Sequence, residues 1–106
     1  MSRQYRRYEI LLPLRRNDGT ALPREVFSQT WKDLIDRFGA VSPETQVIKG
    51  QWRRHQEIQS EQLIRVFVDV EDVAENRAFF VKLKEDLKAR FQQVDIWITH
   101  HRIEVL

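Results

Sequence analysis

Hydrophobic and polar residues alternate through residues 61–72, a stretch that contains neither glycine nor proline. Successive side chains of a strand point to opposite faces, so this pattern predicts a strand with one aliphatic face and one mixed face. The aliphatic face holds Ile64, Val66, Val68 and Val70, and the mixed face holds Leu63, Arg65, Phe67 and Asp69. We interpret this stretch as the central strand of a small sheet.

Two more alternating stretches, residues 8–14 and 94–98, predict the first and last strands. Their apolar positions are Tyr8, Ile10, Leu12 and Leu14 in the first stretch and Val94, Ile96 and Ile98 in the second. Pro13 has no N–H to donate, so regular pairing is expected to lapse there, at the strand's end or at a bulge. The tail to residue 106 can extend the last strand.

Residues 44–54 predict a further strand, placed between the first helix and the central strand. Gly50 lies within it and indicates a bulge or a close approach of backbone. The sequence therefore does not assign the residues after Gly50 to one face of the sheet or the other. The polar residues 55–60 are predicted to form the hairpin loop that leads into the central strand.

Two stretches carry apolar residues at the three- and four-residue spacing of an amphipathic helix. The first begins at Pro23 and ends before Gly39, residue types that suit the first turn and the position after the last turn. The second follows Asp72 and Glu75, which resemble a capping box. The predicted buried residues of the second helix are Val73, Phe80, Leu83, Leu87 and Phe91.

The predicted order of strands and helices is βαββαβ, which is typical of an α+β, ferredoxin-like fold. We expect a four-stranded antiparallel sheet with both helices on one face and with the first and third strands at its centre. One such domain would span residues 8–106. Residues 1–7, which contain Arg3, Arg6 and Arg7, are predicted to be a flexible basic arm.

Composition narrows the classes of protein. A chain of 106 residues, 42% of them hydrophobic, can bury one core without disulfides or metals. It has no cysteine, no apolar segment typical of a signal peptide, and no run long enough to cross a bilayer, so we expect a cytoplasmic protein that does not bind membranes. Outside residues 1–16 it carries 13 basic and 15 acidic side chains, so the basic excess lies at its start.

The sheet face away from the helices is predicted to be a mixture of large apolar and charged groups. Its members are Glu9, Leu11, Leu63, Arg65, Phe67, Asp69, Trp97, Thr99 and His101. Contiguous apolar patches usually mark interfaces or ligand grooves, so a homodimer is expected, with Leu11, Leu63, Phe67 and Trp97 as interface residues. The alternative is a monomer with scattered surface hydrophobes.

Residues 50–55 contain the densest cluster of side chains that are common in binding sites, because Trp52 and Arg53 combine contact area with directed polar groups. The candidate ligand-binding residues are Trp52, Arg53, Arg65, Asp69, Trp97 and His101, and the ligand would be a small molecule or a protein. The competing interpretation is an ordinary edge strand, whose charges block unwanted pairing.

Several short motifs resemble those of a family of small bacterial domains without an assigned activity. They are Arg37-Phe38, GQWR at residues 50–53, Glu61 and KARFQQ at residues 88–93. The resemblance spans about residues 35–98. It implies one α+β domain and brings no activity, cofactor or site residue.

Catalysis and metal binding have weaker support. A small enzyme with a pocket on the sheet face of a dimer is an alternative, in which Glu9, Asp69 or His101 would act as acid or base. His100 and His101 are adjacent, so in a strand they point to opposite faces and cannot grip one metal. The three glycines are far apart, which excludes a glycine-rich phosphate loop. We predict no metal and no cofactor.

Nucleic-acid binding is a third hypothesis, through the N-terminal arginines together with Trp52 and residues 53–55. A four-stranded sheet with exposed aromatic residues is one way to stack bases. Against it, the domain outside the basic arm is slightly acidic, so nucleic acid is an unlikely partner on charge alone.

Overall fold

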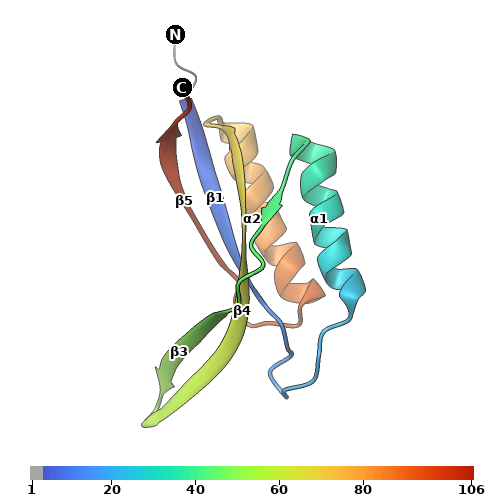
Figure 1. Ribbon diagram of the computed structural model, residues 1–106, viewed down its shortest axis with the longest axis vertical. Helices are drawn as coiled ribbons and strands as arrows, with labels where there is room; N and C mark the ends of the chain where they lie inside the picture. Colours follow the sequence, from blue (N-terminus) through green and yellow to red (C-terminus); the bar gives the residue numbers. More distant parts are fainter. Residues whose placement is uncertain (1–3) are drawn as a thin grey trace.

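In the computed structural model, which describes residues 4–106, two helices lie side by side on one face of an antiparallel sheet (Figure 1). The elements in chain order are β1 (Gln4–Pro13), α1 (Arg24–Phe38), β2 (Ser42–Pro43), β3 (Ile48–Arg54), β4 (Glu57–Glu71), α2 (Ala74–Arg90) and β5 (Trp97–Glu104). This arrangement confirms the predicted ferredoxin-like α+β fold.

The sheet has β1 and β4 at its centre, as predicted, in the order β2-β4-β1-β5, with β3 also pairing with β4. Five strands are present in the described residues rather than four. The additional strand is β2, in which Ser42 pairs with Phe67 and Pro43 with Val66. Because β2 and β3 follow each other along the same edge of β4, they together occupy the place of one strand in the expected sheet.

β4 connects two parts of the molecule. Its second half pairs with β1, from Leu63 opposite Pro13 to Glu71 opposite Tyr5, and its first half pairs with β3 alone. The β3–β4 hairpin projects beyond the rest of the sheet (Figure 1). We call residues 48–62 the hairpin arm, and the sheet beyond them with its two helices the body.

The predicted flexible basic arm at the N-terminus is wrong for residues 4–7, because β1 already begins at Gln4; residues 1–3 lie outside the described part. Arg6 and Arg7 are fixed by carboxylates of the neighbouring chain segment, Asp72 at 3.0 Å and Asp69 at 2.7 Å. Charge pairing across the strands thus extends β1 beyond its apolar stretch.

The hairpin arm decides the alternative at Gly50 and corrects two predictions, the strand start at residue 44, which lies instead at Ile48, and the length of the loop. Pairing runs one-to-one from Ile48–Leu63 to Arg54–Glu57, so there is no bulge at Gly50. A Cβ on Gly50 would lie 3.1 Å from Leu63 Cδ1, which agrees with the close approach that glycine indicated. The expected loop 55–60 shrinks to a two-residue turn at His55 and Gln56, and His55 adopts a φ of 58°. β4 is longer as a result.

The last strand lies further along the chain than predicted. β5 spans Trp97–Glu104, so the tail extends it, whereas residues 94–96 precede it and Val94 is exposed. Ile96 is buried as expected. The predicted alternation therefore holds from Ile96 onward but not for Val94. The strand starts three residues later than predicted because pairing with β1 begins at Trp97, opposite Leu11.

The predicted capping role of Asp72 is wrong. The residue at the start of α2 is Val73, which makes no side-chain capping hydrogen bond, and Asp72 instead accepts hydrogen bonds from Arg6. Val73 is exposed, contrary to its assignment to the core stripe. At the end of α1, Gly39 takes a φ of 79° and donates its N–H to Ile35, as a glycine after a helix commonly does.

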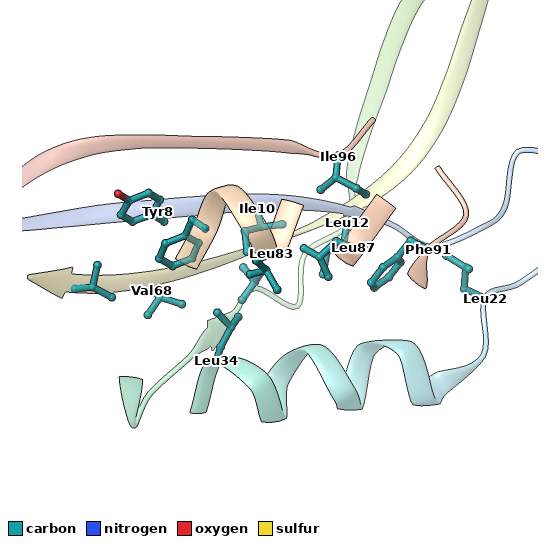
Figure 2. Close-up of a cluster of buried hydrophobic side chains, with 13 residues drawn as sticks. Tyr8, Ile10, Leu12, Leu22, Leu34, Val68, Leu83, Leu87, Phe91 and Ile96 are labelled. Carbon is teal, nitrogen blue, oxygen red and sulfur yellow. The ribbon is translucent and has the colours of Figure 1, made fainter. Parts of the chain in front are cut away.

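The core lies between the helices and the aliphatic sides of β1 and β4 (Figure 2). Its buried residues include Ile10, Leu12, Val66, Leu34, Leu83, Leu87, Phe91 and Ile96. Tyr8 stacks on Phe80 with ring centroids 3.9 Å apart. The buried hydroxyl of Thr30 donates to the Val26 carbonyl at 2.7 Å and accepts from Arg90 at 3.0 Å, so this polar group is satisfied inside the helix layer.

Candidate functional site

The sheet face away from the helices, here called the open face, brings the sequence-predicted residues into three rows across β4, β1 and β5. The rows are Asp69–Arg7–His101, Phe67–Glu9–Thr99 and Arg65–Leu11–Trp97. Leu63 lies beside Pro13 at the end nearest the hairpin arm. The parity of the strands was sufficient to place these side chains together.

Arg7 occupies a central position on the open face, although the sequence placed it in a flexible arm. Its guanidinium makes two hydrogen bonds to Asp69, of 2.7 and 3.0 Å, and lies 4.3 Å from the centre of the Phe67 ring. The hydrogen bonds to Asp69 raise the pKa of Arg7 above its ordinary value. The missed signal was alternation, because Tyr5, Arg7 and Glu9 share one side of a strand.

Two carboxylates of this face are therefore already paired with cations. Asp69 is held by Arg7, and Glu44 lies 3.7 Å from Arg65. Asp69 is held in a pair with two hydrogen bonds to one guanidinium, a geometry typical of a structural ion pair. Glu9 is half-buried between Phe67 and Thr99.

The apolar part of the open face lies toward the hairpin arm. Leu11 and Leu63 are half-buried, whereas Trp97 has 62% of its surface exposed. A depression of about 290 Å³ lies beside them, and its polar rim is formed by Glu61, Gln93 and Asp95. Phe67 belongs less to this surface than predicted, since the Arg7 guanidinium covers its ring.

Trp52 and Arg53 do not form one cluster. Because pairing in the arm is regular, Trp52 lies opposite Gln59 and Arg53 lies opposite Ile58, and the two side chains point to opposite sides of the ribbon. Trp52 shares its side with Glu61 and the open face, and Arg53 lies on the helix side. Both are exposed.

The three histidines are separated. His101 lies opposite Arg7 on the open face and His55 at the tip of the arm. His100 lies on the other side of β5, where its Nδ1 is 2.9 Å from an Arg6 nitrogen. Burial and the nearby Arg6 charge lower the pKa of His100. In residues 4–106 no group of three or more His, Asp or Glu side chains is placed to hold a metal ion.

Neither helix in the described part of the chain has the length and apolar character that a membrane crossing requires.

Comparison with known proteins shows the fold. The chain matches no family model and no curated protein sequence. It is similar in structure to the divalent cation tolerance protein Cut A1 from Thermus thermophilus, with a TM-score of 0.63, 20% identity and coverage of 93% of this chain and 84% of that one. It is also similar to a phage SAM lyase solved with S-methyl-5′-thioadenosine, with a TM-score of 0.64, 15% identity and coverage of 95% and 90%.

Proposed function

We propose that this chain is a non-catalytic, homo-oligomeric binding module, and that a dimer forms by pairing of two open faces. The supporting observation is the state of that face: its central charges are matched within one chain, while the apolar surface around Trp97 is left uncovered by the described residues. We place the module in the cytoplasm, as the sequence led us to expect.

The matched charges lower the cost of burying this face. An unpaired ion loses its hydration on burial, whereas a paired and hydrogen-bonded one keeps a partner. Arg7 and Asp69 form such a pair. Burying large apolar side chains contributes about 1.5–3 kcal/mol each, so Leu11, Leu63 and Trp97 can favour association. A twofold axis covers such a patch with a copy of itself.

The hairpin arm gives a second argument for assembly. It is a two-stranded ribbon without a covering layer in the described chain, and Trp52 and Ile58 are exposed on it. An isolated two-stranded hairpin is at best marginally stable in water. Contact with another copy next to the open face would shield this ribbon.

Sedimentation velocity of the wild type across a dilution series tests the proposal. We expect a dimer at micromolar concentration and a monomer for Trp97→Asp, because a carboxylate in the centre of the interface would be buried without a partner. Val81→Asp is the matched control, since Val81 is also 62% exposed but lies on α2, and it should remain dimeric. A wild type that sediments as a monomer at every concentration contradicts the proposal.

A further inference from the structure

β1 and β4 separate after Pro13, and a cavity opens at their fork. From this point the chain after β1 enters the loop before α1, and the first half of β4 lies in the hairpin arm, which diverges from that loop (Figure 1). The space between them has a volume of about 630 Å³ and is lined by Arg15, Arg16 and Asn17 of the loop and by Lys49, Trp52 and Ser60 of the arm. Lys49 and Ser60 lie on the helix side of the ribbon and Trp52 on its other side, so the cavity reaches both sides of the free edge of β4. We call it the fork cavity.

The cations of the fork cavity are held by neutral hydrogen-bond acceptors rather than by ion pairs. Arg15 donates to the Gly19 carbonyl at 3.1 Å, and Arg16 donates to the Ala21 carbonyl and the Gln92 amide oxygen at 2.9 and 3.0 Å. These acceptors are neutral. Asp18 lies outside the cavity lining, and its pKa is lowered by hydrogen bonds from Thr20 and by the nearby charge of Arg16, without an ion pair to Arg16. Neither arginine, nor Lys49, takes part in an ion pair with the described residues.

The free edge of β4 adds one backbone donor, the Ser60 N–H, to this positive site. The Leu14 N–H donates to the Gln62 carbonyl at 3.1 Å, and this is where pairing with the β1 side ends. Alternate residues of a strand direct their backbone N–H groups to the same edge. The Ser60 N–H therefore points to the same edge of β4 as the backbone groups of Gln62, the edge nearer β1. No described strand pairs with that edge at Ser60. Glu61 is the acidic side chain of the lining.

Cations together with a free backbone N–H favour an oxyanion such as a phosphate. Trp52, which is 45% exposed, adds an indole face on which a planar ring can stack. A volume of about 630 Å³ falls in the range of small-molecule sites. We propose that the fork cavity binds a small phosphorylated ligand with a planar ring, of which a mononucleotide is the simplest example. This site adjoins the proposed dimer face, because Glu61 lines both the fork cavity and the depression beside Trp97.

Isothermal titration calorimetry with AMP tests the proposal, with adenosine and ribose 5-phosphate as its two halves. We expect AMP to bind more tightly than either half, because the cavity contacts both the ring and the phosphate. Lys49→Gln and Trp52→Ala should each weaken AMP binding about tenfold, as expected for losing a charge-assisted contact or a stacking contact. Both residues are exposed, so the fold should survive.

Arg53→Gln is the matched control. It removes the same charge from the same strand and the same side of the ribbon as Lys49, but Arg53 is nearer the tip and outside the cavity lining. Its AMP affinity should equal that of the wild type, and Trp97→Asp should also retain AMP binding because Trp97 does not line the cavity.

Three results with AMP and its two halves would overturn the proposal. The first is the absence of any heat of binding at millimolar AMP. The second is a loss of AMP affinity in Arg53→Gln equal to that in Lys49→Gln, which would mean a general attraction of anions. The third is binding of ribose 5-phosphate as tight as that of AMP. Tighter binding of a single-stranded RNA oligonucleotide that depends on Arg53 would also overturn it, in favour of a nucleic-acid surface along the arm.

Discussion

The body and the hairpin arm share one strand but differ in what covers it. In the second half of β4, Val66, Val68 and Val70 lie beneath the helices and are buried. In the first half the same alternation continues, yet Ile58 has 58% of its surface exposed. The difference shows that alternation sets the direction of a side chain, whereas burial depends on a second layer that only the body has.

The two regions also differ in electrostatics. The body contains ion pairs between β1 and the end of β4 or the residue after it, Arg7 with Asp69 and Arg6 with Asp72. In the described part of the chain no ion pair involves a residue of the arm. The arm is therefore held by its backbone ladder and is expected to open locally at a lower free energy than the body.

The largest effect is expected from breaking the layer that defines the body. Leu87 is fully buried between α2 and the sheet (Figure 2), so Leu87→Ala should lower the free energy of unfolding by about 2–5 kcal/mol through lost burial and a cavity. Urea denaturation followed by circular dichroism measures it. A change below about 1 kcal/mol would mean that α2 does not cover the sheet as described.

A smaller, pH-dependent effect is expected at Asp72, which joins three elements of the body. Hydrogen bonds from Arg6 lower the pKa of this carboxyl below its ordinary value of 3.8, and Arg102 of β5 lies 3.5 Å away. Because the folded state favours the ionised carboxylate, the ion pair contributes its full stabilisation at pH values above the ordinary pKa of 3.8. This contribution is lost as the pH falls through the lowered pKa of the folded state.

Asp72→Asn should therefore lower the urea midpoint at about pH 7, and the difference from the wild type should shrink toward about pH 2. Asp36→Asn is the control, since Asp36 belongs to an exposed pair within α1, and its midpoint should change little. If Asp72→Asn lowers the urea midpoint by the same amount at both pH values, the ion pair is not the cause of the destabilisation.

The smallest effect is expected in the arm. Ile58→Ala removes an exposed side chain from the ribbon, so the free energy of unfolding of the monomer should change by no more than about 0.5 kcal/mol. The Trp97→Asp background, measured by urea denaturation, keeps assembly from contributing. A loss of the size expected for Leu87→Ala would show that the arm packs against the body of its own chain.

The sequence predicted both helices and the faces of the central strands, because these depend on local periodicity. It also predicted which residues share the open face, since parity alone decides that. It misassigned Arg7 and Asp72, whose partners lie 62 and 66 residues away in the chain. A charged residue near a terminus or a helix start has the same local pattern whether it is solvated, caps a helix or pairs across a sheet.

The amino-acid pattern by itself thus determined the ferredoxin-like order of elements and the separation of an aliphatic face from a mixed one, because hydrophobic spacing acts within a few residues. Only the tertiary structure decided that β4 continues past the end of β1, that a ribbon without a second layer projects from the body, and that a cavity opens at the fork. These features depend on where strands distant in sequence stop pairing, and no local spacing specifies that point.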